Sequence, residues 1–180
     1  MIHELKVATS RVGVLIGKGG ATKKELESKT HTTISIDSKE GLVKVEGAEE
    51  NAIPLLRAVE IINAVNVGFS PERAFEMIED EDLLLDIIDL SRAADNPKQL
   101  DRLRGRIIGK DGRAREQIEN MTDVDLSVFG HTVALIGYPE QMKVARAAID
   151  MLIEGVPHEN VFAFLDKKKK AKDDDVQFNF

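Results

Sequence analysis

The amino-acid sequence predicts an α+β fold in which one unit of about 80 to 90 residues occurs twice in tandem. The first observation is a repeated motif: residues 12–20 read VGVLIGKGG and residues 104–112 read RGRIIGKDG. The second is that the sequences stay in register after the motif, where Leu26-Glu27 matches Ile118-Glu119. The third is that short stretches with the two-residue period of strands stand between longer stretches with helical spacing.

The elements of the first unit follow from these periods and from capping residues. Polar and apolar residues alternate in Glu4–Val7, in Thr33–Asp37 and again in Leu42–Glu46 after a turn, which predicts three strands. Ser70 before Pro71 is a helix N-cap followed by proline at the first helical position. The predicted helices are residues 12–16, residues 20–28, a longer helix ending near Asn66, and residues 71–79.

The second unit repeats this order. Residues 83–90 fit either a buried strand or a helix face, and the repeat favours a strand. Residues 93–100 are then an insertion in a loop. The remaining predictions are a short helix reaching Ile108, a helix to Asn120, a hairpin of residues 124–128 with 132–136, and a helix over 139–154.

A run of acidic residues, 79–82, marks the seam between the units. We expect one domain over residues 1–80 and another over residues 81–166, each with an extra helix after its last core helix. The final residues, 167–180, contain four consecutive lysines and then three consecutive aspartates, so we expect a charged, disordered tail.

Composition restricts the class of protein. Hydrophobic residues make up 42% of the chain and cysteine is absent, so neither disulfides nor thiolate metal sites can form. No signal peptide is visible and no apolar run is long enough to cross a bilayer. We therefore expect a soluble, cytoplasmic protein.

Positive charge gathers at the two glycine motifs although the formal net charge is -7. Residues 11–24 carry four cations and no acid, and residues 102–115 carry six cations and one acid. Local charge of this kind steers a polyanionic ligand better than the net charge suggests. Charge runs are usually solvated helix faces, but the same bias at both copies makes that interpretation less favourable.

Each unit, ordered as strand, helix, Gly-x-x-Gly, helix, strand, strand, helix, resembles a KH domain of the first topological type. The resemblance implies a three-stranded sheet covered by three helices. It also implies that each glycine loop clamps the backbone of about four nucleotides of single-stranded nucleic acid. The loop residues that would contact the backbone are Gly17, Lys18, Gly19 and Gly20 in the first unit, and Gly109, Lys110, Asp111 and Gly112 in the second.

The chemistry of the loop explains the residue types. Glycines let a sugar-phosphate chain approach the main chain, and the following helix presents N–H groups and its positive dipole end. Basic residues around the loops would support binding: Arg11, Lys23, Lys24, Arg102, Arg104, Arg106, Arg113 and Arg115. By resemblance, bases would lie in an apolar groove and be read by the backbone of the middle strand. For each groove residue, a position in the hydrophobic core is at least as well supported. The groove residues are Ile16, Leu26, Ile34, Ile36, Ile108, Ile118, Leu126 and Val128.

Other nucleotide and metal motifs do not fit. Residues 13–18 are one residue short of a Walker A loop, and the glycines lack dinucleotide-fold spacing. The four histidines are scattered, so we expect no metal or cofactor, and no carboxylate pair forms a recognisable catalytic motif. Aromatic residues are only 4% of the chain, which disfavours a base-stacking platform.

The residue three places after the last glycine is basic in both units, where many KH domains have an aliphatic residue. With residues 118–122 and 143–155, this makes the chain similar to the ribosome-assembly KH family called partner of Nob one, or Dim two, with Krr-type relatives. Its short length and two intact motifs suggest the archaeal version.

The family resemblance implies binding near the 3′ end of small-subunit ribosomal RNA, without catalysis, and a PIN-domain endonuclease or other assembly or translation factors as partners. The second unit would be the principal site, since its arginine cluster is denser and Asp111 is outweighed by its cations. Two alternatives remain open: a protein-interaction scaffold built on KH folds, and an exosome-type or single-stranded-DNA KH protein.

Overall fold

The computed structural model describes residues 1–178 and forms two compact units, Met1–Leu83 and a second unit that begins at Leu84. The predicted boundary after residue 80 lies close to this division. No helix in the described part of the chain is both long and apolar enough to cross a bilayer.

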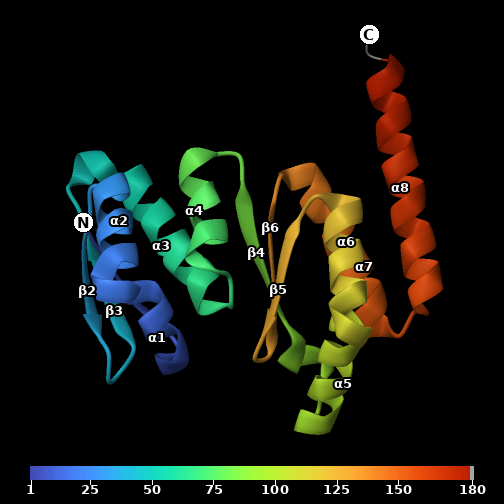
Figure 1. Ribbon diagram of the computed structural model, residues 1–180, viewed down its shortest axis with the longest axis horizontal. Helices are drawn as coiled ribbons and strands as arrows, with labels where there is room; N and C mark the ends of the chain where they lie inside the picture. Colours follow the sequence, from blue (N-terminus) through green and yellow to red (C-terminus); the bar gives the residue numbers. More distant parts are fainter. Residues whose placement is uncertain (179–180) are drawn as a thin grey trace. The chain divides into compact units, whose positions relative to one another are not determined.

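The first unit is an antiparallel sheet of three strands with helices on one face (Figure 1). The strand order is β1-β3-β2, so the middle strand in the chain, β2, is an edge strand of the sheet. Short 3-10 turns precede α2 and α3. The elements are β1 (Ile2–Lys6), α1 (Thr9–Ile16), α2 (Ala21–Thr30), β2 (Thr33–Asp37), β3 (Leu42–Glu46), α3 (Ala52–Asn66) and α4 (Pro71–Glu79).

The apolar positions of these elements meet in one core. Val43 and Val45 alternate with outward-facing polar residues in β3, and Ile34 pairs with Val45 in the register of β2 with β3. Leu55 and Ile62 of α3 are fully buried beneath the sheet. The predicted bounds of β2, β3, α4 and the end of α3 are confirmed.

The second unit repeats the arrangement, with strand order β4-β6-β5. The strand predicted within residues 83–90 is present as β4, Leu84–Asp89. The elements are β4 (Leu84–Asp89), α5 (Pro97–Ile108), α6 (Arg113–Thr122), β5 (Asp125–Phe129), β6 (Thr132–Gly137), α7 (Pro139–Glu154) and α8 (His158–Phe178). The fold class predicted from the sequence, two α+β units of the same design, is confirmed.

The helix before the second glycine loop is longer than expected. The prediction of a loop over residues 93–100 is wrong for its second half, because α5 begins at Pro97. The side chain of Asn96 caps this helix by accepting a hydrogen bond from the Gln99 N–H at 2.9 Å. Asn96-Pro97 is thus the same helix-start signal as Ser70-Pro71 in the first unit.

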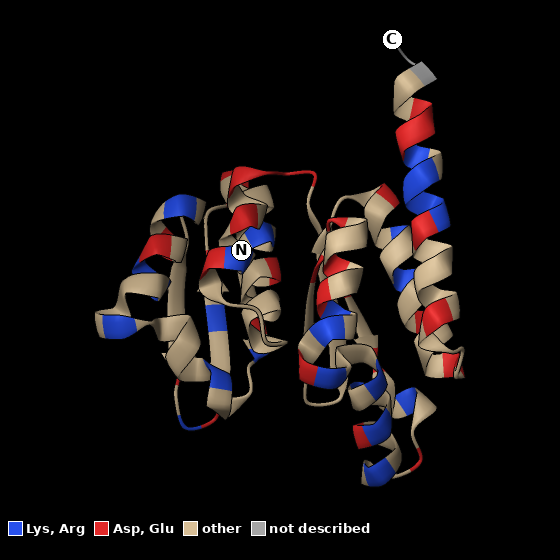
Figure 2. Cartoon of the chain, turned by 45° about the vertical axis from the view of Figure 1, so that its right-hand side comes forward, with Lys and Arg blue, Asp and Glu red and all other residues tan. Residues whose placement is uncertain are grey.

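The tail also differs from expectation, since α8 continues through the charged residues to Phe178, while residues 179–180 lie outside the described part of the chain. Side chains four residues apart contact each other along this helix. Lys170 pairs with Asp166 at 3.1 Å, and the Lys168 ammonium lies over the Phe164 ring, 5.8 Å from its centre. Figure 2 shows the lysines and aspartates as successive blocks along α8.

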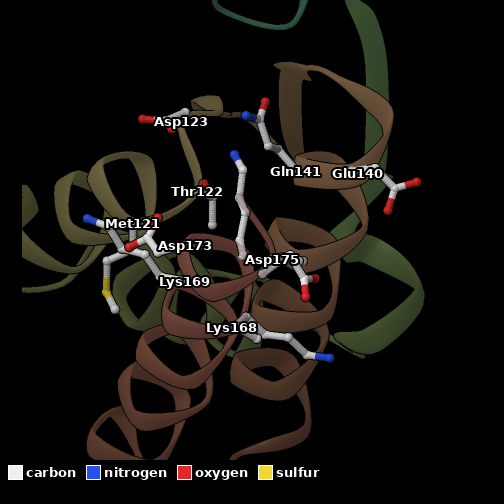
Figure 3. Close-up of a pocket in the computed structure, with 12 residues that line it drawn as sticks. Met121, Thr122, Asp123, Glu140, Gln141, Lys168, Lys169, Asp173 and Asp175 are labelled. Carbon is white, nitrogen blue, oxygen red and sulfur yellow. The ribbon is translucent and has the colours of Figure 1, made fainter. Parts of the chain in front are cut away.

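The charged half of α8 lies beside the junction of α6 and α7. A cavity of about 450 Å³ there is lined by residues of all three helices (Figure 3). Met121 and Thr122 come from α6 and Gln141 from α7, while Lys168 and Asp173 come from α8. The lining carries both signs of charge, which suits solvated packing of the tail against the second unit.

A polar cluster ties the end of β4 to the β5–β6 turn. Asp89 Oδ1 accepts hydrogen bonds from the Ser91 hydroxyl at 2.6 Å and the Ser91 N–H at 2.9 Å, and lies 3.0 Å from His131 Nδ1. These contacts, led by the Ser91 hydroxyl, lower the pKa of Asp89 from 3.8 to about 2.

This depressed pKa gives a pH prediction. Folding lowers the pKa of this carboxyl, so its ionised form stabilises the folded protein at any pH above the pKa of the unfolded state, 3.8. This stabilisation is lost as the pH falls from 3.8 towards 2. Carboxyl-carbon NMR titration should find Asp89 titrating near pH 2, and Ser91→Ala should move the midpoint upwards. A midpoint near 3.8 in the unsubstituted protein would contradict the cluster.

Candidate nucleic-acid interface

The two glycine loops have one backbone conformation. Gly17 has φ +75° and ψ 173°, and Gly109 has φ +74° and ψ 177°. The last glycines agree equally well, with φ +77° for Gly20 and +74° for Gly112. In each loop the N–H of the last glycine donates to the carbonyl of the first, at 3.1 and 3.3 Å. The repeat in sequence is therefore a repeat in geometry.

The first glycine of each loop is required by the packing as well as by its φ. A Cβ on Gly17 would collide with the Thr22 hydroxyl, and a Cβ on Gly109 would lie 2.6 Å from the Cβ of Ala114. Positive φ at both positions adds strain to any side chain. The turn thus brings the end of one helix against the first turn of the next.

The third loop position accepts either glycine or aspartate. Gly19 has φ +62° and Asp111 has φ +57°, and nothing lies within 4 Å of a Cβ built on Gly19. Aspartate adopts this left-handed conformation more readily than most residues. Asp111 therefore occupies the loop without distorting it, and its side chain is exposed.

The helices that follow the loops begin without a side-chain cap. The N-cap residues of α2 and α6 are Gly20 and Gly112, neither of which can supply a capping oxygen. The first N–H groups of these helices lack that partner, and the helix dipole places partial positive charge there. Such a terminus is suited to a phosphate group.

A glutamate on each of these helices holds the edge strand in place. Glu27 accepts a hydrogen bond from the Ile34 N–H at 2.7 Å, and Glu119 accepts one from the Leu126 N–H at 3.4 Å. These N–H groups point away from the neighbouring strand. Because backbone direction alternates along a ladder, the N–H groups two residues further on, at Ile36 and Val128, also point outwards.

The basic residue three places after the last glycine pairs with this glutamate. Lys23 lies 3.3 Å from Glu27, and Arg115 lies 3.6 Å from Glu119. Both cations are therefore held between the glycine loop and the edge strand. The glutamates were aligned in the sequence but not predicted as site residues; the signal was their position four residues after a basic residue in both copies.

The predicted groove residues fall into two groups. Leu26 and Ile118 are fully buried, and Ile34 and Leu126 are 2% exposed, so all four belong to the cores. The other four are half-buried and retain accessible surface beside the loops or on the edge strands: Ile16, Ile36, Ile108 and Val128.

Arg11 supports the fold rather than the loop surface. Its Nε donates to the carbonyl of Val65 at 2.8 Å and its Nη2 donates to that of Phe69 at 2.9 Å. Val65 lies in the last turn of α3 and Phe69 follows the helix, so the guanidinium bonds to carbonyls at and just after its C-terminus. Partial burial lowers the pKa of Arg11.

Arg106 makes the same contacts in the second unit. It donates to the carbonyls of Leu152 at 3.0 Å and Val156 at 2.6 Å, at the end of α7. Its own carbonyl lies 2.7 Å from His158 Nε2. Arg11 and Arg106 therefore stabilise the fold, whereas the sequence had predicted that both support RNA binding.

The remaining predicted cations surround the loops. Arg104 is half-buried and lies 3.9 Å from Asp101. Lys18, Lys24, Arg102, Lys110 and Arg113 are exposed, and no ion pair involves any of these five within residues 1–178. Within the same residues, no group of three or more carboxylates and histidines is placed to hold a metal ion.

Comparison with known proteins agrees with this geometry. The KH domain profile matches residues 2–64, and the profile of the eukaryotic-type KH domain (KH-domain type I) matches residues 84–170. A KH domain-containing protein of Methanocaldococcus jannaschii, MJ0443, is 37% identical over 171 residues, which cover 94% of this chain and 74% of that protein. The crystal structure of Dim2p from Pyrococcus horikoshii superposes with a TM-score of 0.86 at 42% identity, covering 93% of this chain and 99% of the other.

The chain belongs to the Pno1/Dim2 family of tandem KH-domain proteins. Another P. horikoshii structure, the a/eIF2alpha–aDim2p–rRNA complex, matches with a TM-score of 0.88 at 42% identity over 95% of each chain. Eukaryotic members are more distant: the RNA-binding protein pno1 of Dictyostelium discoideum is 29% identical over 68% of this chain. The chain spans about half, 52%, of that protein.

The packing at the first loop glycine gives a stability prediction for this Pno1/Dim2 protein. Gly109→Ala should lower the free energy of unfolding by about 2–4 kcal/mol, because positive φ and overlap with Ala114 both oppose the added methyl group. Gly112→Ala should cost only about 1–2 kcal/mol, since nothing lies near its Cβ. Urea denaturation measures both; equal losses would contradict the packing argument.

A matched pair of arginines separates structural from surface charge. Arg106→Ala should lower the free energy of unfolding by about 2–4 kcal/mol, since two carbonyls lose a charged donor. Arg113→Ala, which removes the same charge from an exposed position, should change it by about 0.5 kcal/mol at most. The role assigned to Arg106 would be wrong if both variants unfolded at the same urea concentration.

Proposed function

We propose that this protein is a non-catalytic single-stranded RNA-binding protein that acts in small ribosomal subunit biogenesis in the cytoplasm. The observation that carries the proposal is the repeated site itself. Each unit combines a glycine loop, an uncapped helix N-terminus and an edge strand with outward N–H groups. Within residues 1–178, nothing lies within 4 Å of a Cβ built on Gly19 or Gly112, so the loops are open at these glycines.

In this account each part of the site recognises a different part of the nucleotide. A phosphate lies at the N-terminus of α2 or α6, where N–H groups and the helix dipole attract it. Lys18 and Lys110 neutralise neighbouring phosphates. Bases pack on the half-buried aliphatic side chains and meet the outward backbone groups at Ile36 and Val128.

The family relationship supports RNA as the ligand and ribosome biogenesis as the process. The archaeal aDim2p structure is a complex that contains rRNA, and a related protein of Emericella nidulans is named a pre-rRNA-processing protein. We infer that this chain binds near the 3′ end of small-subunit rRNA. The second unit is the principal site, since its loop is flanked by more exposed arginines than the first loop.

Protein partners also belong to the proposal. The archaeal relative was solved with a/eIF2alpha as well as rRNA. We propose that this chain likewise binds a translation factor, and that a PIN-domain endonuclease joins it on the RNA. Capture of either partner that survives ribonuclease treatment would indicate a direct protein contact; loss of capture after the treatment would indicate bridging by RNA.

Charge reversal in the loops tests RNA binding. Lys18→Asp with Gly19→Asp, and separately Lys110→Asp, should each weaken binding of a single-stranded RNA matching the rRNA 3′ end roughly 10-fold, because phosphate contacts are lost. Gly19→Asp reproduces the residue that the second loop already holds at the same φ, so it should not disturb folding. Fluorescence anisotropy at several salt concentrations should show the salt slope falling by roughly 0.7 per lost contact.

The controls separate this function from its alternatives. Glu72→Gln removes the charge of an exposed carboxylate in the first turn of α4, outside both glycine loops, and should leave the affinity unchanged. DNA of the same sequence should bind more weakly if a 2′-hydroxyl is read. Affinity and salt slope that survive in the variant carrying all three loop substitutions would contradict RNA binding by the loops.

A further inference from the structure

A second basic surface lies behind the glycine loop of the second unit. It is a depression of about 620 Å³ formed by α5, the start of α6 and the start of α8. Figure 2 shows Lys and Arg along α5 and around this loop. The residues that define the depression are Arg102, Arg106, Lys110, Arg113, Gln117 and Phe162.

This depression is separate from the base groove described above. Arg113 and Gln117 are one helical turn apart on α6 and line the depression. Arg115 and Glu119 are also one turn apart, but Glu119 contacts the edge strand β5. An offset of two residues is about 200° around a helix, so the two pairs occupy opposite faces of α6. The glycine loop, with Lys110, lies between the two surfaces.

The charge in the depression is unbalanced. None of the residues that line it is acidic. Arg102, Lys110 and Arg113 are exposed and have no ion-pair partner among residues 1–178. Arg106 is held beneath them by its bonds to the carbonyls of Leu152 and Val156. Three unpaired cations on a concave surface favour an anion with several oxygens, which guanidinium groups bind in a forked geometry.

The first unit provides an internal comparison, because the fold is the same. The loops align with an offset of 92 residues, which places Ser10 at the position of Arg102 and Ala21 at that of Arg113. The same offset places Glu25 at the position of Gln117. The first unit therefore forms its loop and helices without these two arginines and with an acid instead of glutamine. The shared fold does not require cations at these two positions, so Arg102 and Arg113 are available to a ligand.

We propose that this depression binds backbone phosphates of the same RNA strand, next to the nucleotides held by the glycine clamp. Lys110 belongs to both the glycine clamp and the depression. An RNA strand that crosses the loop therefore contacts cations continuously as far as Arg102 and Arg113. The second unit thus engages a longer segment of RNA than the first. This inference rests on the proposed function, because it extends the path of the strand bound there.

Replacing the depression by its first-unit counterpart tests the proposal. The variant Arg102→Ser, Arg113→Ala, Gln117→Glu should lose less affinity for a four-nucleotide RNA, which the glycine clamp alone spans, than for a longer RNA. For a ten-nucleotide RNA of the same core sequence it should lose roughly 10-fold at 0.15 M salt, and its salt slope should fall by roughly 1.4, as expected for two lost phosphate contacts. Thermal unfolding checks that the variant folds.

The reverse exchange and a free anion complete the test. Ser10→Arg, Ala21→Arg, Glu25→Gln in the first unit should strengthen binding of the ten-nucleotide RNA. Equal affinity of the unsubstituted protein and the second-unit variant for the long RNA would overturn the inference while leaving the clamp intact. Failure of the unsubstituted protein to bind either RNA would instead refute the proposed function. Pyrophosphate binding that depends on Arg102 and Arg113, with no effect of RNA length, would show a free-anion site and overturn the strand path.

Discussion

The absence of a side chain at Gly17 and Gly109 is the constraint on which both candidate sites depend. Both residues have positive φ, and the space that a Cβ would need is taken by Thr22 or by Ala114. Only glycine fits there, and it lets one helix end directly against the first turn of the next. That contact leaves the N-terminus of the second helix open and directed at the loop. It also fixes the helix whose glutamate holds the edge strand. One turn therefore positions both the proposed phosphate site and the strand that we propose contacts the bases.

The two units also show how one structural task can be met from different sequence positions. Arg11 stands six residues before its loop glycine and Arg106 stands three before. Each nevertheless donates to one carbonyl in the last turn of α3 or α7 and to another just after that helix. A shift of three residues keeps a side chain on nearly the same helix face. Alignment of the repeats therefore hides this equivalence, and only the hydrogen bonds reveal it.

The periodicity of the sequence was sufficient for the strands and for most helices, because each element buries one face. Strand β2 and helix α4 have the bounds that alternation and the Ser70-Pro71 cap predict. The tail was not predictable in this way. Its lysines and aspartates have no apolar face, and α8 is an extension of a helix whose buried residues, Val161 and Leu165, lie earlier in the chain.

For the site, the sequence identified the loops but could not assign the charges. Arg106 and Arg113 are both basic residues near the same glycine, and only the structure distinguishes a donor to backbone carbonyls from an exposed cation. The sequence also could not tell groove residues from core residues. Leu26 and Ile36 are both aliphatic residues of the first unit, but Leu26 is fully buried in the core and Ile36 is only half-buried. Such roles depend on which way a side chain points relative to other elements, and that is a tertiary property.

The central claim is that RNA binds at the glycine loops and the adjoining edge strands. Amide chemical-shift mapping of the isotope-labelled protein, titrated with single-stranded RNA from the rRNA 3′ end, tests it most directly. We expect the largest changes at residues 17–23 and 109–115 and at Ile36 and Val128, with smaller changes on the outward faces of the central strands β3 and β6. Changes confined to surfaces remote from both loops would contradict the account.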